Sequence, residues 1–234
     1  MLTWLIFEST SESIFALPSG VRSIDLGVER GPVRLFGVSF ERDQPGVIYN
    51  SLGLNGGQVQ VVVRYFDKSQ WAFELQHQRP DLVVLNYGTN ESVFAEYIDR
   101  QYAGELREVI ARVKAAVPNA SVLVMSPMDR GQRDSSGQIS TVPTLPRLVA
   151  IQQRIAAEMD CAFFNPFQAM GGEGTMGRWY ESQPRLVSAD FMHPLPGGAR
   201  QVGVLLDQAL ETGFREYQAR HRQSAPSVVA GKQP

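Results

Sequence analysis

From about residue 58 onward, short apolar runs alternate with stretches in which apolar residues recur at helical spacing. Residues 82–85 and 122–125 are continuous apolar runs, which is typical of strands buried in a parallel sheet. Helical faces are formed by Tyr102, Leu106, Val109, Ile110 and Val113, by Leu148, Ile151, Ile155 and Met159, and by Val202, Leu205, Leu206, Ala209, Leu210 and Phe214. This alternation predicts an α/β domain with a mostly parallel sheet between two helical layers.

Further elements follow from the same pattern. We expect a helix over residues 61–75, ending before Pro80, and a strand at residues 162–164. Residues 126–143 are rich in Gly, Asp and Ser and predict a long loop. Cys161 is the only cysteine, so it forms no internal disulfide, and we expect it to act as a small core residue.

The N-terminal part of the chain has a different pattern. Residues 21–26 and 33–40 alternate apolar and polar positions between turn-forming stretches, which indicates antiparallel hairpins. The polar, aperiodic C-terminal end predicts disorder. The expected organisation is a partial β-sandwich over residues 1–46, an α/β domain over 47–217 and a disordered tail over 218–234.

Composition and charge exclude some classes of partner. The chain has 234 residues, of which 43% are hydrophobic and 20% charged, as in an ordinary globular protein. Its net charge of −2 offers no basic excess, so we expect no nucleic-acid partner. No apolar run approaches the ~20 residues of a membrane-spanning helix. The N-terminus lacks the basic region and cleavage site of a signal peptide.

A polar segment, Gly88-Thr89-Asn90, directly follows the apolar run at residues 82–85. Functional groups in open α/β sheets gather at the carboxyl ends of strands. The side-chain amide of Asn90 can donate a hydrogen bond to a developing oxyanion. The alternative is that Asn90 caps the helix that follows, since Asn is a preferred N-cap residue.

Three glycines lie in residues 53–57, namely Gly53, Gly56 and Gly57. They permit positive φ and a close approach of the backbone, so the Gly56 amide can face the same oxyanion as Asn90. The alternative is a plain tight turn. The segment lacks the Gly-Lys-Ser/Thr ending of a phosphate-binding loop, so it does not indicate a nucleotide cofactor.

Asp190 and His193 lie three positions apart, just before the last predicted helix. This spacing lets the carboxylate orient the imidazole, which is the base-and-orienter half of a Ser-His-Asp triad. No second His or Cys stands near His193 at metal-ligand spacing. We therefore expect no metal and no cofactor.

In this order, residues 50–57, 87–91 and 190–194 resemble blocks two, three and five of the SGNH (GDSL-type) ester hydrolases. The resemblance covers about residues 47–215. It implies a three-layer, flavodoxin-like α/β/α fold and ester hydrolysis through an acyl-serine.

By this resemblance, Gly56 and Asn90 match the oxyanion-hole residues, and Asp190 and His193 match the acid and base of the triad. Glu91 is a departure, because many members carry Asp there. That position is not a reacting group in the family.

A closer resemblance is to the bacterial peptidoglycan O-acetylesterase and O-acetyltransferase branch, carried by residues 45–53, 87–91 and 170–174 and by Trp179. That branch has a carbohydrate-binding-like β-sandwich inserted between blocks one and two. Residues 1–46 resemble the end of such an insert. The resemblance implies an O-acylated carbohydrate substrate, and a periplasmic or extracytoplasmic location if an upstream segment exists.

Block one of the family, Gly-Asp-Ser, is absent from the sequence. We expect this nucleophile and its strand to lie upstream of Met1. Ser9, after an apolar run, is a weaker candidate because it stands in hairpin-like sequence. Without that strand, unpaired sheet edges favour self-association.

Two other functions stay open. One is a non-catalytic truncated product or carbohydrate-binding module that keeps the fold. The other is a flavodoxin-like binder of a nucleotide or flavin, which has no phosphate-binding signature here and leaves Asp190 and His193 unexplained.

Overall fold

The computed structural model describes residues 13–35, 38–42 and 44–223. The chain divides into two units, Met1–Ser51 and Leu52–Pro234. The described residues of the first unit form turns but no helix or strand, and their side chains are exposed. The strands expected in that unit are therefore not formed there, since a hairpin without a third strand or a core is marginal in water. The partial β-sandwich stays a prediction.

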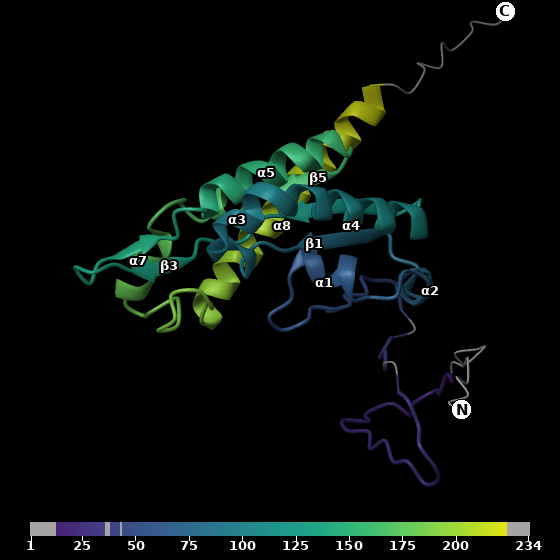
Figure 1. Cartoon of the computed structure of the whole chain (residues 1–234). Helices are drawn as coiled ribbons and strands as arrows, with labels where there is room; N and C mark the ends of the chain where they lie inside the picture. The colour runs from purple at the N-terminus through teal and green to yellow at the C-terminus, as the bar shows by residue number, and fades with distance from the viewer. Residues whose placement is uncertain (1–12, 36–37, 43, 224–234) are drawn as a thin grey trace, which may run out of the picture. The chain divides into compact units, whose positions relative to one another are not determined.

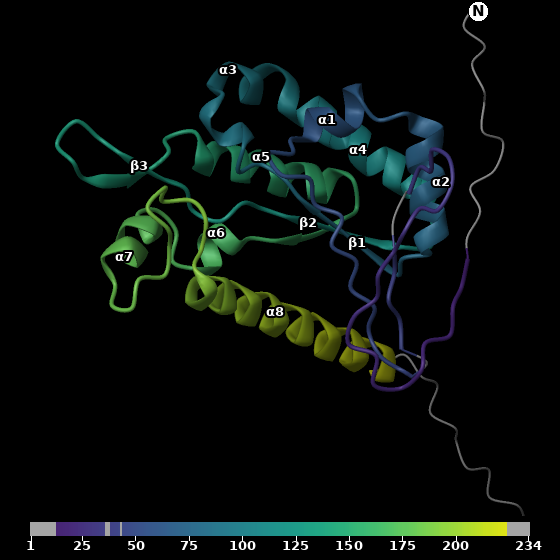
Figure 2. The same ribbon diagram turned by 90° about the horizontal axis from the view of Figure 1, so that it is seen from below.

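The second unit is built on a parallel sheet of β1 (Leu82–Asn86), β2 (Ser121–Met125) and β5 (Ala162–Phe164), in the order β1-β2-β5. Val84 of β1 stands opposite Leu123 of β2. Figure 2 shows α4 and α5 on one side of this sheet and α8 on the other. The arrangement confirms the predicted three-layer α/β/α fold with a mostly parallel sheet.

The helices α4 (Ala103–Ala116) and α5 (Leu145–Glu158) bury the apolar faces that the sequence predicts. Leu106, Val109, Ile110 and Val113 are buried on α4, and Leu148 and Ile155 on α5. Val122 and Val124 of β2 belong to the same core cluster. Full burial of such side chains stabilises a fold by about 1.5–3 kcal/mol each.

One predicted helix is two. Residues 61–75 were expected to form one helix. Instead, α1 (Val59–Arg64) ends at Arg64, and α2 (Lys68–Gln78) begins four residues later. The side chain of Asp67 accepts a hydrogen bond from the backbone N–H of Gln70 at 2.8 Å. This N-cap satisfies a free donor of a new helix, which explains the break.

The predicted loop at residues 126–143 contains a hairpin of β3 (Gly131–Arg133) and β4 (Ile139–Thr141). The carboxylate of Asp134 closes its turn by accepting the backbone N–H groups of Ser136 and Gln138. Side-chain turns of this kind are local chemistry that apolar periodicity does not report.

The remaining elements are short, except the last. They are the 3-10 turn η1 (Glu91–Val93), α3 (Ala95–Tyr97), the π-helix η2 (Ile98–Tyr102), α6 (Pro166–Ala169), α7 (Thr175–Glu181) and α8 (Pro196–Gln223). Figure 1 shows α8 running to the end of the described chain. Residues 218–223 are thus helical rather than part of a disordered tail, and residues 224–234 lie outside the described residues. None of the described helices is long and apolar enough to cross a membrane.

The outer edge of β1 has no pairing strand in the part of the chain that the structure describes. Leu82 and Val84 of this strand are 42% and 43% exposed, although strands of parallel sheets are normally covered on both faces. We therefore predict that the purified chain self-associates through this edge, as seen by size-exclusion chromatography with light scattering.

The substitution Val84→Lys should shift the chain toward monomer, because a lysine on an edge strand opposes pairing. Val93→Lys is the matched control, since Val93 is 47% exposed outside the sheet. A monomeric wild-type chain with a cooperative melt would contradict the prediction.

Candidate active site

The Asp190–His193 turn precedes α8 and brings the two predicted residues together. Asp190 Oδ2 lies 2.6 Å from His193 Nδ1. The other carboxylate oxygen, Oδ1, accepts hydrogen bonds from the Ser188 hydroxyl and from the backbone N–H groups of Met192 and His193. One oxygen therefore fixes the turn while the other orients the imidazole. The His193 side chain is 70% exposed, so a ligand from solvent can reach it.

The charge of Asp190 suits that arrangement. Partial burial acts to raise the pKa of the Asp190 carboxyl, but hydrogen bonds from Ser188, His193 and Met192 outweigh it and hold this pKa well below its usual range. The carboxylate thus stays ionised at neutral pH. In that state it accepts the Nδ1–H of the imidazole and leaves Nε2 free to take a proton.

Phe191, between the two predicted residues, anchors the turn. Its φ of 57° is a left-handed conformation, which a bulky residue seldom adopts. Its carbonyl accepts the backbone N–H of Gly131 at 2.9 Å, and its ring packs edge-on against Tyr180. The guanidinium of Arg133 lies 5.1 Å from the ring centre. The β3–β4 hairpin and α7 therefore hold the dyad in place.

The glycine turn and the Asn90 segment also meet. Gly56 has φ of 71° within a turn closed by the Gly57 N–H on the Leu54 carbonyl at 2.8 Å. Asn90 Nδ2 donates to the Gly57 carbonyl at 2.9 Å. Asn90 stands at the N-cap position of η1, but its side chain makes no capping hydrogen bond. Its amide is thus directed at the glycine turn and not at its own helix.

Glu91 links the chain after the glycine turn to the Asn90 segment through hydrogen bonds. It is fully buried, and its two oxygens accept the backbone N–H of Val59 at 2.8 Å and of Gly88 at 3.0 Å. Burial raises the pKa of this carboxyl, and the hydrogen bonds from Val59 and Gly88 oppose that shift. The resemblance described above gives the Glu91 position no role in the reaction. Nothing in the local sequence indicates this link to α1.

Gly88 is required by packing. It has φ of 116°, and a Cβ there would lie 2.7 Å from Leu148 Cδ2. Gln152, buried on α5, donates to the Tyr87 carbonyl and to the Tyr102 hydroxyl, both at 2.7 Å. The loop that carries Asn90 is therefore seated directly on α5.

Arg130 and Gly131 connect the two halves of the site. Arg130 donates to the carbonyl of Thr89 at 2.6 Å, next to Asn90, while the neighbouring Gly131 N–H bonds the carbonyl of Phe191. Burial lowers the pKa of Arg130, and the nearby charge of Asp190 opposes this. The structure thus brings the Asn90 loop and the dyad to adjoining residues of one hairpin.

The attacking residue is not among these groups. Within the described residues, the only hydrogen-bond partner of the His193 ring is Asp190, and no serine reaches it. Ser9, the weaker candidate, lies outside the described residues. The described part of the chain contains no group of three His, Cys, Asp or Glu residues that could hold a metal ion.

The fold agrees with a match to a family model. Residues 13–201 match the model of the GDSL-like Lipase/Acylhydrolase family, so the chain belongs to this family and has the SGNH hydrolase fold. Among curated proteins there is no significant match.

Solved structures are similar at low identity. A structure described as "Peptidoglycan O-acetylesterase in action" is 22% identical, with a TM-score of 0.56, over 64% of this chain and 45% of that one. An acetyl xylan esterase is 18% identical with a TM-score of 0.48, over 66% of this chain and 76% of that one. A GDSL-like lipase from Parabacteroides merdae has the same identity and TM-score, over 66% and 68%. The chain thus spans less than half of the first of these proteins.

Proposed function

We propose that this chain supplies the base, its orienting acid and the oxyanion donors of an esterase that removes O-acetyl groups from a carbohydrate. The observation that carries the proposal is the Asp190–His193 pair at 2.6 Å, joined through Arg130 and Gly131 to the Asn90 loop. His193 Nε2 takes the proton of the attacking serine and returns it to the leaving sugar oxygen. Asp190 holds the imidazole in the tautomer that allows this.

The oxyanion donors are the backbone N–H of Gly56 and the side-chain amide of Asn90. An Asn amide carries two N–H donors, and one of those on Asn90 bonds the Gly57 carbonyl. The second is available for the negative oxygen of a tetrahedral intermediate. Family membership supports ester chemistry. The carbohydrate acetyl substrate is supported by the motifs at residues 45–53 and 170–174 and by the name of the peptidoglycan O-acetylesterase.

The nucleophile is proposed to be the serine of a Gly-Asp-Ser segment on a strand that pairs with the free edge of β1. That edge is open in the described residues, and its carboxyl end leads into the Asn90 loop. A serine ending such a strand stands beside the oxyanion donors. We call the chain extended at its N-terminus by this strand the extended protein, and its release of acetate from an O-acetylated oligosaccharide tests the proposal. The absence of release by a well-folded extended protein would contradict it and favour a non-catalytic carbohydrate-binding role.

In the extended protein, Asn90→Ala should lower kcat by roughly 10²–10³ with little change in KM, because the amide acts only on the developing oxyanion. Steady-state kinetics on p-nitrophenyl acetate, with a melting curve of the same protein, check this. A loss of about 1 kcal/mol in stability with kcat unchanged would instead make Asn90 a structural link to the Gly57 carbonyl and would contradict the oxyanion role.

A further inference from the structure

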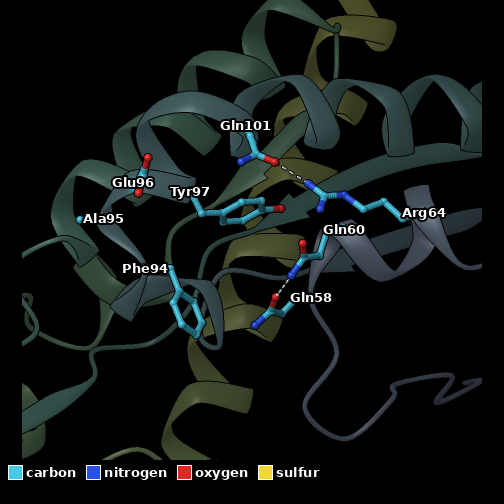
Figure 3. Close-up of a pocket in the computed structure, with 8 residues that line it drawn as sticks. All are labelled: Gln58, Gln60, Arg64, Phe94, Ala95, Glu96, Tyr97 and Gln101. Atoms are coloured by element: carbon cyan, nitrogen blue, oxygen red, sulfur yellow. Dashed lines mark hydrogen bonds between the residues drawn. The ribbon is translucent and has the colours of Figure 1, made fainter.

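A groove lies beside the glycine turn and the Asn90 loop. It runs between α1 and the η1-α3-η2 segment and has a volume of about 480 Å³, within the ~300–1,000 Å³ of small-molecule sites. Figure 3 shows Gln58, Gln60 and Arg64 on one side and Phe94, Tyr97 and Gln101 on the other. Nothing in the proposed chemistry uses these side chains.

The groove adjoins the proposed oxyanion donors on both walls. Gln58 directly follows Gly57, whose carbonyl holds the Asn90 amide. Phe94 ends the 3-10 turn that begins after Asn90, so a single short turn separates the two residues.

Each glutamine of the groove leaves one polar atom free. The amide of Gln60 donates to Gln58 Oε1, and Arg64 donates to Gln101 Oε1. In the described residues, Gln58 Nε2, Gln60 Oε1 and Gln101 Nε2 have no protein partner. The walls therefore offer two donors and one acceptor, already oriented by their neighbours, and sugar hydroxyls are both donors and acceptors.

The charges of the groove are balanced. Arg64 Nε bonds Glu105 at 2.8 Å, and the Tyr97 hydroxyl bonds the other oxygen of the same carboxylate. Glu96 is paired with Arg100 at 2.8 Å. Both charged residues among the described residues that line the groove, Arg64 and Glu96, are thus paired, which favours a neutral ligand over an anionic one.

Phe94 supplies an apolar surface. Its side chain lies at the groove and the residue is 50% exposed. An exposed aromatic face contributes contact area at low cost in conformational entropy, and the C–H face of a pyranose fits it. The wall that carries Phe94 continues into the π-helix η2, which places Gln101, and π-helical turns occur often at functional sites.

We propose that this groove binds a neutral pyranose ring of the carbohydrate chain, next to the sugar whose O-acetyl group is removed. This inference rests on the proposed function for the identity of the neighbouring reaction. Phe94 stacks on the ring, and the three glutamine amides bond its hydroxyls.

The test is a calorimetric titration of the 234-residue chain with chitotetraose, a neutral tetramer of N-acetylglucosamine. Phe94→Ala should raise Kd about tenfold. Gln101→Ala should raise it roughly three- to tenfold by removing one donor. Phe73→Ala is the matched control, since Phe73 is 45% exposed on α2, away from the groove, and it should leave Kd unchanged.

Three results would overturn the inference. They are no binding of chitotetraose by the folded chain, equal effects of Phe94→Ala and Phe73→Ala, and binding of the anionic tetragalacturonate as tight as that of the neutral probe. Melting curves of all variants separate loss of the groove from loss of the fold.

The groove and the proposed function fail separately. p-Nitrophenyl acetate carries no sugar, so Phe94→Ala in the extended protein should lower kcat/KM for an O-acetylated chitooligosaccharide about tenfold more than it lowers kcat/KM for p-nitrophenyl acetate. Sugar binding without any ester hydrolysis would contradict the proposed esterase activity and support sugar binding in the groove. Hydrolysis of both esters with no effect of Phe94→Ala would support the esterase activity and contradict sugar binding in the groove.

Discussion

The 234-residue chain alone is expected to hydrolyse p-nitrophenyl acetate at least 10³-fold more slowly than the extended protein, as an order of magnitude. Within the described residues the imidazole of His193 is oriented by Asp190 but bonds no serine. Oxyanion donors and an oriented base retain only a small part of the activity of a complete triad. Release of p-nitrophenol by both proteins under the same conditions measures the difference.

Ser9→Ala is the variant that makes this result informative. It should leave the low rate of the 234-residue chain unchanged. Comparable activity of the two proteins, abolished by Ser9→Ala, would make Ser9 the nucleophile and the added strand unnecessary. Comparable activity that survives Ser9→Ala would require a nucleophile elsewhere in the chain and would contradict the account of the site.

In the extended protein, His193→Ala should lower kcat by roughly 10⁴ or more, because no other group moves the proton from the serine to the leaving oxygen. His77→Ala is the matched control, as His77 is an exposed histidine on α2. Steady-state kinetics on p-nitrophenyl acetate give both values.

The fold should tolerate the His193 change. The ring is 70% exposed and, among the described residues, bonds only Asp190. The turn itself is held by backbone bonds to the Asp190 Oδ1 atom and by Phe191. The melting temperature of His193→Ala should therefore stay close to that of the wild type. Retention of more than a tenth of the activity by a folded His193→Ala protein would show that another base is used.

The elements that the sequence predicts well are those defined by burial. The ends of β2, α4 and α5 lie within three residues of the segments expected from apolar periodicity, because that periodicity records which face of each element meets the core. Leu106, Val109 and Ile110 are buried as expected.

The elements that the sequence does not predict depend on single polar side chains. Asp67 begins a new helix, and Asp134 closes a hairpin turn, each through bonds to nearby backbone N–H groups. These interactions leave no apolar pattern. The strands expected in residues 1–46 are the opposite case. Apolar and polar positions alternate there, but the described residues form no β-sheet hydrogen bonds.

The candidate site follows the same division. The residues that would act on an ester, Asn90, Asp190 and His193, were selected from their motifs, and their roles stay proposals. Their supports, Glu91 and Phe191, were not found from the sequence. Glu91 acts across 32 positions to Val59, and Phe191 reaches a hairpin that was expected to be a loop. Both contacts depend on the chain path, which local sequence does not specify.

The most direct measurement is acetate release from an O-acetylated oligosaccharide by the extended protein and by its counterpart in which Gly-Asp-Ala replaces the added Gly-Asp-Ser. We predict release only with the serine, and loss of that release in His193→Ala. Equal release by the two proteins, or release with the serine that His193→Ala leaves intact, would show that the Asp190–His193 pair is not the base of an acyl-serine esterase.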